Sequence, residues 1–446
     1  MFFPVPLCFS PAAPLNPAYG NKELDFYLND LNARLLIVDE ASPGPAIEAA
    51  TKRGMAILRI TCGAHDNAGV LTSPELTAAA PKSSADGPTP DDIALVLHTS
   101  GTTSRPKIVP LSQRNLTASA AHIAASLALG PDDVCLNIMP LFHIHGLVAA
   151  VLSSLQAGAS VVCTPGFNAL RFMSLLKSEN PTWYSAVPTM HQAIVERAAR
   201  QPEEAQNNRL RFIRSSSASL APSVLKDLEA TFGCTVIEAY GMTEAAHQMT
   251  SNPLAPGRRK PGTVGLAAGP EVRIADAQGA FLPLGTEGEI VICGPNVTSG
   301  YENNPAADAG AFFVAGDAPA RWFRTGDLGR FDQDGFLTVT GRIKEMINRG
   351  GEKIAPREVD EVLLLAPGVT QAVTFGYPHP KLGEDVAAAV VLAPGSDATP
   401  ESIRAFAAER LAPFKLPRKI IVVDEVPKGA TGKIQRIGLA ALLGIG

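Results

Sequence analysis

Cysteine is scarce in this chain, and the few cysteines present are scattered. The sequence holds 6 cysteines in 446 residues, with no C-x-x-C pair among them. A disulfide framework or a structural zinc site needs cysteines at close, repeated spacings. We therefore expect neither, and the distribution suits a reducing compartment.

An excess of basic residues and long apolar runs are also missing. The 38 Lys and Arg residues against 43 Asp and Glu residues give a net charge of -5, so nucleic acid and anionic membranes are poor partner candidates. The longest apolar runs have the length of a strand, which predicts no membrane span. The N-terminus, MFFPVPLCF, lacks the basic residues of a secretory signal, and the C-terminus, LLGIG, lacks an S-K-L peroxisomal address. The expected location is cytoplasmic.

Apolar runs and helical windows alternate from residue 93 to about residue 240. The predicted strands are Ile93–Leu97, Val134–Met139, Ala159–Cys163, Trp183–Val187, Phe212–Arg214 and Thr235–Ala239. The helical windows between them are Gly146–Gln156, Leu170–Lys177, Met190–Arg200 and Ser223–Phe232. This order predicts a parallel sheet covered by helices, and so an α/β fold.

The pattern changes near residue 262 and again after Gly341. Short alternating strands with Gly, Pro and Asp turns (Glu271–Ile274, Glu289–Cys293, Gly335–Thr340) predict a small antiparallel β region. The last segment predicts an α+β domain, with a helix at Glu358–Leu365 and strands at Val369–Gly376, Val386–Leu392 and Ile420–Val423.

Residues 98–110, HTSGTTSRPKIVP, are rich in Gly, Ser and Thr. They follow the strand Ile93–Leu97 and precede a helical pattern that opens near Asn115, which predicts strand, loop and helix in that order. Backbone N–H groups and hydroxyls of such a loop can converge on phosphate oxygens, and Lys107 can neutralise charge. The loop is not the G-x-x-x-x-G-K-[ST] loop of P-loop NTPases. An ordinary Ser/Thr/Gly turn is the alternative.

This loop resembles the phosphate-binding signature, T-S-G-T-T-G-x-P-K-G, of the adenylate-forming superfamily of acyl-CoA synthetases, luciferases and peptide-synthetase adenylation domains. Ser104 and Ile108 stand where glycine is usual. The resemblance implies that the loop holds the β- and γ-phosphates of ATP through Thr99, Ser100, Gly101, Thr102, Thr103 and Lys107.

Two further motifs follow in the family's order. In PLFHIHG (140–146), the resemblance implies that His143 lies at the substrate carboxylate, with His145 the weaker candidate; two packed histidines are the alternative. SSSAS (215–219) ends a predicted strand, where ligands sit in open α/β sheets. Ser217, Ala218 and Ser219 would let adenine approach the backbone, and Ser217 would also bind the substrate; a solvated serine loop is the alternative.

The motif YGMTE (240–244) also matches the family. Tyr240 would stack on a purine, and Gly241 and Thr243 would contact the nucleotide. Glu244 would hold Mg²⁺ through its carboxylate, although a lone Glu after a strand is usually solvated. His247, placed one helical turn after Glu244, is a candidate for the substrate's anion.

Residues 322–353 and 427–436 carry the rest of the resemblance. Asp327 would accept the ribose hydroxyls (an Asx turn is the alternative), and Arg342 would support the ribose and phosphates. Gly350 and Gly351 would present backbone to the pantetheine arm of CoA. In PKGATGKIQR, Lys433 matches the family's catalytic lysine, whereas Gly429 replaces the usual Thr or Ser; a surface lysine is the alternative.

The domain layout follows from the same resemblance. It implies a large AMP-binding domain over residues 1–341, a hinge at 342–345 that contains Lys344, and a small mobile domain over residues 346–446. Family members carry a further segment ahead of the position of Met1. A shortened, non-catalytic protein that binds nucleotide or acyl-adenylate is therefore an alternative to an enzyme.

The implied activity is that of an ATP-, Mg²⁺- and CoA-dependent ligase that forms an acyl-adenylate and then a thioester. FIRSSSASLAP, EAYGMTEAAHQMTSNPL and GPNVTSGYENNP look most like the plant and fungal oxalate–CoA ligases. A small dianion would need hydroxyls and imidazoles, which Ser217, His143 and His247 supply. The same residues could serve malonate, and ligases for aryl or fatty acids remain alternatives. The sequence does not define the oligomeric state.

Overall fold

The computed structural model describes residues 10–39, 44–61, 70–72, 87–99, 106–315, 320–427 and 436–445. The chain divides into two compact units, Met1–Leu97 and His98–Gly446. Within the described ranges, no helix combines the length and the apolar character needed to cross a membrane.

The first unit contains a small α/β layer. Its elements are α2 (Asn21–Asp30), β1 (Leu35–Asp39), α3 (Gly44–Lys52), β2 (Ala56–Thr61) and β3 (Val70–Thr72). Strand β2 pairs in parallel with β1 and antiparallel with β3. Leu24 and Leu28 of α2 pack with Ala49 of α3, so the two helices share one apolar contact. The strand β4 (Ile93–Thr99) begins at the end of this unit.

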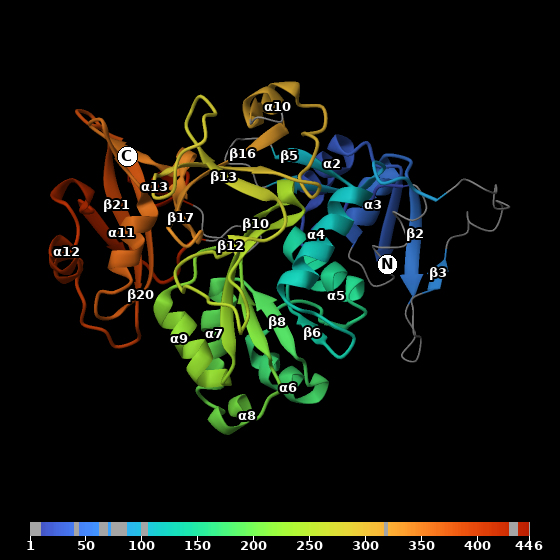
Figure 1. The fold of residues 1–446 in the computed structure, drawn as a ribbon, viewed down its shortest axis with the longest axis horizontal. Coiled ribbons are helices and arrows are strands. Elements are labelled where there is room, and N and C mark those ends of the chain that lie inside the picture. The colour runs from blue at the N-terminus through green and yellow to red at the C-terminus, as the bar shows by residue number, and fades with distance from the viewer. Residues whose placement is uncertain are drawn as a thin grey trace. The chain divides into compact units, whose positions relative to one another are not determined.

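A seven-stranded sheet is the centre of the second unit (Figure 1). Its order is β12-β11-β10-β9-β8-β6-β7. The strands are β6 (Val134–Asn137), β7 (Ser160–Cys163), β8 (Trp183–Ala186), β9 (Phe212–Ser215), β10 (Thr235–Met242), β11 (His247–Ser251) and β12 (Leu266–Ala267). Strands β6 to β10 run parallel, as the sequence predicts, whereas β11 and β12 are antiparallel. The predicted strand Ile93–Leu97 lies in β4, which does not belong to this sheet.

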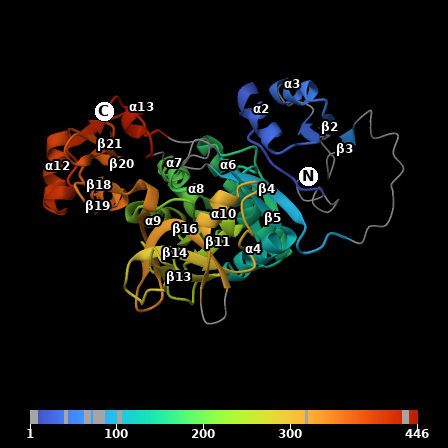
Figure 2. The same ribbon diagram turned by 90° about the horizontal axis from the view of Figure 1, so that it is seen from above.

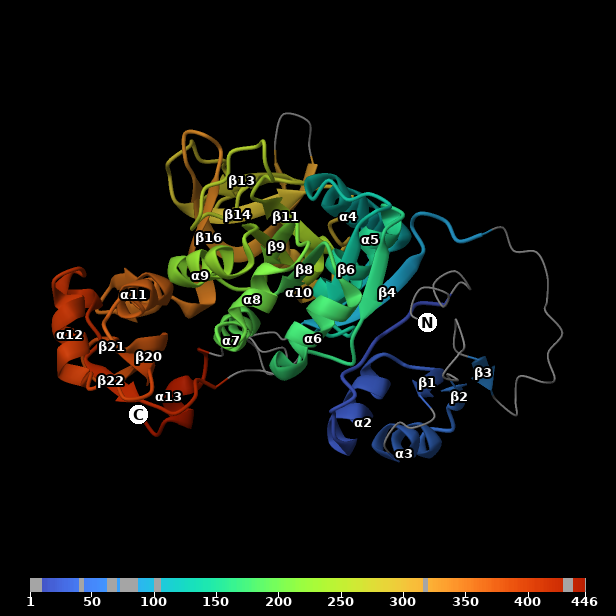
Figure 3. The same ribbon diagram turned by 90° about the horizontal axis from the view of Figure 1, so that it is seen from below.

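Helices fill the connections of this sheet. They are α4 (Gln113–Ser126), the π-helix η2 (His145–Leu152), α5 (Ser153–Gln156), α6 (Ala169–Glu179), α7 (Pro188–Ala198), α8 (Pro202–Gln206) and α9 (Pro222–Phe232). Phe172, Ile194 and Leu228 of three helices pack on Tyr184 and Ile213 of the strands. Figure 3 shows α6, α7 and α8 gathered there. Proline opens α7, α8 and α9, where its missing N–H costs nothing.

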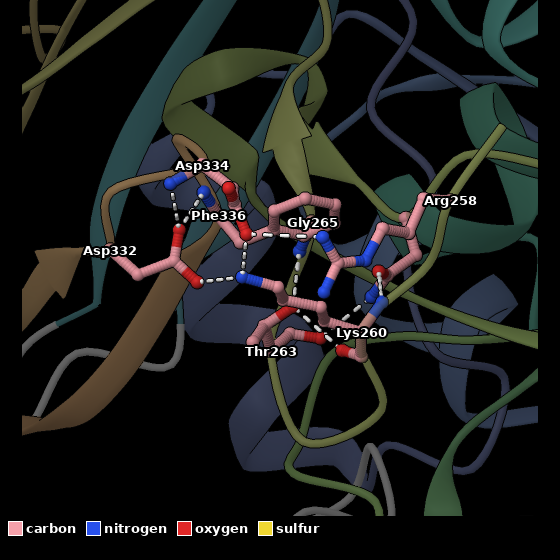
Figure 4. Close-up of polar contacts among 8 residues, drawn as sticks. Arg258, Lys260, Thr263, Gly265, Asp332, Asp334 and Phe336 are labelled. Carbon is pink, nitrogen blue, oxygen red and sulfur yellow. Dashed lines mark hydrogen bonds and ion pairs between the residues drawn. The ribbon is translucent and has the colours of Figure 1, made fainter.

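The predicted antiparallel β region is confirmed. It consists of β13 (Glu271–Ala275), β14 (Gly288–Cys293), β15 (Phe312–Ala315), β16 (Ala320–Phe331) and β17 (Leu337–Arg342), with α10 (Pro305–Ala311) before β15. A preceding loop is tied to the β16–β17 turn by Lys260, whose Nζ lies 2.6 Å from Asp332 Oδ2 and also pairs with Asp334 (Figure 4). The same ammonium lies over the Phe336 ring. This contact fixes the edge of the β region.

The C-terminal segment folds around a mixed sheet, whose strands pair antiparallel except that β22 runs parallel to β21. Strands β18 (Ile347–Arg349), β19 (Glu352–Ile354), β20 (Val369–His379), β21 (Gly383–Leu392) and β22 (Lys419–Val422) are joined by α11 (Pro356–Leu363), α12 (Pro400–Ala408) and short 3₁₀ turns, and α13 (Leu439–Leu442) follows. Figure 2 shows α12 and α13 beside these strands. Val386 and Ala388 face one apolar cluster and Ala387 and Ala389 the other, so the sheet is covered on both faces. The expected α+β segment is confirmed.

The predicted order of strand, loop and helix after residue 93 is wrong. A strand, β5 (Lys107–Ser112), stands between the loop and α4, and Ser112 caps the helix by accepting the Asn115 backbone N–H. Ile108, Val109 and Leu111 are buried, so this short apolar run forms a strand despite Pro110. A helix N-terminus therefore does not directly follow the Gly/Ser/Thr loop, and Lys107 opens a strand.

Candidate active site

The candidate site residues gather where parallel strands end. SSSAS follows β9 and YGMTE closes β10, and the two strands are neighbours that run in the same direction. Such carboxyl ends are where open α/β sheets bind ligands. Ser100, Gly101, Thr102, Thr103 and Lys433 lie outside the described residues; Thr99 is the last residue of β4.

His145 connects two serines on separate segments. Its fully buried ring places Nδ1 3.0 Å from Ser217 Oγ and Nε2 2.6 Å from Ser185 Oγ. The adjoining Gly146 packs tightly, because a Cβ there would lie 2.5 Å from Pro140 O. The weaker of the two predicted histidines therefore contacts the serine motif.

His143 lies in the turn before η2 and is half-buried. Its Nδ1 accepts a hydrogen bond from the His145 backbone N–H at 3.2 Å. A neutral imidazole that accepts at Nδ1 carries its proton on Nε2. His143 can therefore donate a hydrogen bond from Nε2, which is the property that a carboxylate ligand needs.

His247 does not share a helical face with Glu244, as the sequence analysis expects. Residues Thr243–Ala245 form a single 3₁₀ turn, Ala246 and His247 take positive φ values of 47° and 105°, and His247 opens β11. The chain reverses there because β11 pairs antiparallel with β10. The reversal nevertheless places the buried His247 ring 4.9 Å, centroid to centroid, from His145.

Gly241 closes this reversal at very short range. A Cβ at position 241 would lie 1.7 Å from His247 O, which no side chain could accommodate. Met242 and His247 are register partners of the same antiparallel pair. The glycine of YGMTE is therefore required by the packing of the β10–β11 hairpin.

The serine motif divides into an inner and an outer part. Ser215 and Ser216 are buried, and Ser216 Oγ donates to Ala239 O at 2.9 Å. Ser217 takes a φ of 73°, and Ala218 and Ser219 are exposed. Only the last three residues of the motif are therefore placed to meet a ligand.

Arg214 is a buried cation that the sequence analysis did not single out. It lies on β9, its Nη1 donates to Ser185 Oγ at 3.3 Å, and its Nη2 donates to Gln248 Oε1 at 3.1 Å. Burial lowers the pKa of Arg214 to about 9. A charged residue inside the apolar run FIRS is the signal that could have identified it.

Glu244 forms a second cluster with Tyr301 and Lys107. Tyr301 OH donates to Glu244 Oε1 at 2.9 Å, and Lys107 Nζ lies 4.0 Å from the centre of the Tyr301 ring. Burial raises the pKa of Glu244, and the nearby Lys107 opposes that rise. Burial, followed by the charge of Lys344, lowers the pKa of Lys107. Thr243, half-buried, opens the turn that carries Glu244.

This cluster fits a magnesium ion that is bound together with a nucleotide. Among the described residues, no group of three His, Cys, Asp or Glu side chains could hold a metal by itself. Mg²⁺ commonly keeps several waters and takes one or two carboxylates plus substrate phosphates. Glu244 would supply the carboxylate, and the tyrosine hydrogen bond orients it.

Tyr240, Asp327 and Arg342 meet on three different strands. Tyr240 OH donates to Asp327 Oδ2 at 2.5 Å, and Arg342 Nε donates to Oδ1 at 2.7 Å. Asp327 lies within β16 and pairs in register with Arg342 of β17, so the expected turn position is wrong. The carboxylate raises the pKa of Arg342. A carboxylate has about four lone-pair sites, so two ribose hydroxyls could still bind.

Gly350 and Gly351 form the two-residue turn between β18 and β19. Their φ values are 62° and 97°, which suit the hairpin turns that glycine favours. Their N–H groups donate to Leu382 O and Asn348 Oδ1. Contact with a pantetheine arm would therefore use atoms other than these N–H groups. Lys344 is exposed in the 3₁₀ turn Ile343–Glu345.

Comparisons with known proteins agree with this arrangement. Residues 10–302 match the family described as AMP-binding enzyme, and residues 358–433 match its C-terminal domain. The chain belongs to the AMP-binding enzyme family. It is 48% identical over 444 residues to an oxalate–CoA ligase of Arabidopsis thaliana. The alignment covers 98% of this chain and 84% of that protein.

Solved structures are similar over almost the whole chain. ATP-bound MatB from Rhodopseudomonas palustris has a TM-score of 0.85 at 32% identity and covers 97% of this chain and 84% of its own. O-succinylbenzoate CoA synthetase from Bacillus subtilis, in complex with ATP and magnesium, has a TM-score of 0.80 at 29% identity and covers 98% of this chain and 86% of its own. The predicted α/β fold class is confirmed.

Proposed function

We propose that this protein is an ATP-dependent acid–CoA ligase whose acid is a small dicarboxylate, with oxalate the best candidate. The observation that carries the proposal is the cluster in which His145 contacts Ser217, just after β9, and His247, just after β10. Such a cluster offers hydrogen bonds to a small polar acid. The oxalate–CoA ligase relative supports the choice of acid.

The first half-reaction joins the acid to the nucleotide. A carboxylate oxygen attacks the α-phosphorus of ATP, the bond to the bridging oxygen breaks, and pyrophosphate leaves. Bringing two anions together requires cations and donors that are already in place. Lys433 would neutralise the reacting oxygens, the loop from Thr99 to Lys107 would hold the departing phosphates, and bound Mg²⁺ would supply further positive charge.

The nucleotide is held at its sugar and its base. Asp327, fixed by Tyr240 and Arg342, would accept the ribose hydroxyls, and the Tyr240 ring would lie against adenine. Gly241, Thr243, Ala218 and Ser219 would border the nucleotide. His143 and His247 would orient the acid.

The second half-reaction releases the product. The CoA sulfur attacks the acyl carbon, AMP leaves with the electron pair of the broken C–O bond, and the thiol proton goes to solvent. In the proposed layout, residues 346–446 rotate about the hinge at 342–345, so that Lys433 withdraws and Gly350 and Gly351 approach the pantetheine arm. The match of the C-terminal domain over residues 358–433 supports this division.

The test is ATP–pyrophosphate exchange with purified protein and a panel of oxalate, malonate, acetate, octanoate and coumarate. We expect the highest exchange with oxalate, and oxalyl-CoA detected by mass spectrometry when CoA is added. Exchange that peaks with octanoate or coumarate would overturn the choice of acid. No exchange from folded protein that binds ATP would overturn the ligase and favour a nucleotide-binding protein without catalysis.

A further inference from the structure

Arg214 carries a buried charge without a carboxylate partner among the described residues. Its side chain is 0% exposed on the central strand β9, and it donates hydrogen bonds to two neutral groups, Ser185 Oγ and Gln248 Oε1. Its Nε atom has no hydrogen-bond partner there. Buried charges are normally paired because an isolated one costs several kcal/mol. With no carboxylate paired to Arg214 among the described residues, an anionic ligand held nearby would supply the opposite charge.

A hydrogen-bonded chain leads from Arg214 to the proposed acid site. Ser185 Oγ lies 3.3 Å from Arg214 Nη1 and 2.6 Å from His145 Nε2, and His145 Nδ1 lies 3.0 Å from Ser217 Oγ. Ser185 and Arg214 are register partners on the parallel strands β8 and β9, so both side chains are on the same face of the sheet. The chain therefore rests on fixed backbone geometry.

Arginine and a neutral His145 together define a direction for the hydrogen bonds in this chain. A guanidinium can only donate, so Ser185 accepts from Arg214. When His145 is neutral and accepts at Nε2, the Ser185 hydroxyl donates its proton to that nitrogen. A neutral His145 that accepts at Nε2 must carry its proton on Nδ1, and it donates that proton to Ser217. The Ser217 hydroxyl is left as a donor for a ligand.

We propose that Arg214 is a specificity-determining positioning residue: through Ser185 and His145 it fixes Ser217 as a donor, and its charge selects acids that carry a second carboxylate. Linked hydrogen bonds polarise one another, and low dielectric strengthens the effect. This inference rests on the proposed function. It names the Arg214 guanidinium as the group that lets the enzyme distinguish a dianionic acid from a monoanionic acid of equal size.

Oxalate and oxamate provide the sharpest comparison. Oxamate replaces one carboxylate of oxalate by a neutral amide at nearly the same volume, so the two acids differ mainly in charge. Arg214→Met removes the cation and keeps much of the side-chain volume, whereas Arg214→Lys keeps the charge. Arg211→Met is the matched control, because Arg211 precedes the same strand but is half-exposed and paired with Asp133 at 2.8 Å.

The measurement is kcat/KM for both acids by ATP–pyrophosphate exchange, with thermal unfolding of each variant. For Arg214→Met we expect the oxalate-to-oxamate ratio to fall about tenfold or more, mainly through KM for oxalate, because charge-assisted recognition is lost. Arg214→Lys should recover most of the ratio, and Arg211→Met should leave it unchanged. If the role of Arg214 were merely structural, kcat/KM would fall for both acids together and their ratio would stay the same.

The outcomes separate this inference from the proposed function. A wild-type enzyme that prefers oxalate, with the same ratio in Arg214→Met, would overturn the role of Arg214 and leave the ligase intact. A wild-type protein that activates neither acid would overturn the choice of oxalate and the inference with it. If Arg214→Met does not fold, Arg214→Gln replaces it: a wild-type ratio in Arg214→Gln, or a ratio in Arg214→Lys as low as in Arg214→Gln, would overturn the proposal.

Discussion

Arg436 Nη2 lies 2.5 Å from Asp360 Oδ2, which joins the segment after Lys433 to helix α11. The same guanidinium reaches Glu345 Oε2 at 3.1 Å through Nε and donates to Thr374 O at 3.0 Å through Nη1. Glu345 directly follows Lys344 of the proposed hinge. One half-buried arginine therefore anchors both the end of the lysine segment and the hinge.

Replacing Arg436 by Met should destabilise the folded protein strongly. Removal of one partner leaves the buried Asp360 carboxylate uncompensated, for which we expect a loss of about 3–5 kcal/mol in the free energy of unfolding. Urea unfolding measures it. Arg410→Met, which removes an exposed pair with Glu409, should change stability by about 0.5 kcal/mol or less. Equal small effects in both variants would contradict the anchoring role.

Replacing Asp327 by Asn should weaken selection for ribose. The carboxylate holds Arg342 and Tyr240 and would accept the sugar hydroxyls, so its loss should raise KM for ATP by about tenfold. Exchange assays with ATP and 2′-deoxy-ATP should also show that the preference for ATP shrinks in the variant. Asp332→Asn, on the neighbouring turn, is the control. If Asp327→Asn kept the full preference for ATP over 2′-deoxy-ATP, the ribose hydroxyls would bind to another group.

Glu238 should make stability depend on pH. Burial raises the pKa of this carboxyl to about 7, from an ordinary value of 4.5. Between these values the folded chain binds more protons than the unfolded chain, so the free energy of unfolding should fall as pH rises through the window. The fall attributable to Glu238 is about 3 kcal/mol at most.

The comparison with Glu238→Gln isolates this contribution. Glutamine can still accept the Gly262 N–H, which lies 2.9 Å from Glu238 Oε2, but it does not titrate. Urea unfolding from pH 4.5 to pH 8 should therefore show a smaller decrease for the variant than for the wild type. Parallel pH profiles would mean that the Glu238 carboxyl titrates normally.

Lys433→Ala should separate the two half-reactions. If the ammonium neutralises the reacting carboxylate and α-phosphate, its loss should reduce adenylation by about 100-fold or more and affect thioester formation from preformed acyl-adenylate far less. Single-turnover measurements of each step test this. Lys415→Ala, which removes a surface pair with Glu358, should affect neither step. Comparable losses in both steps would exclude that role for Lys433.

Residues with strong local patterns could be placed from the sequence. Trp183–Ala186 is apolar except for Ser185 and is buried, and it forms β8 where the sequence predicts a strand. Periodicity did not distinguish the π-helix His145–Leu152 from an α-helix, because every residue there except Leu152 is buried and no polar face marks the turn. Strand β5 was missed because Pro110 interrupts its apolar run.

Contacts between distant segments could not be predicted in this way. Tyr301 meets Glu244 across 57 positions, and no local pattern joins them. His247 was expected on a helix because a spacing of three suits helical neighbours, whereas the tight pairing of β10 with β11 imposed a reversal. Arg214 was passed over because its strand is otherwise apolar, and only the fold places it beside Ser185.

The close approach of Gly241 to His247 limits how this site can evolve. The segment that would hold the nucleotide and the histidine that would face the acid belong to one hairpin, and its closure leaves no room for a side chain at position 241. A lineage that acquires a different acid can exchange the imidazole for another group. It cannot enlarge the glycine without displacing the backbone that both ligands share, so new specificities should arise around an unchanged turn.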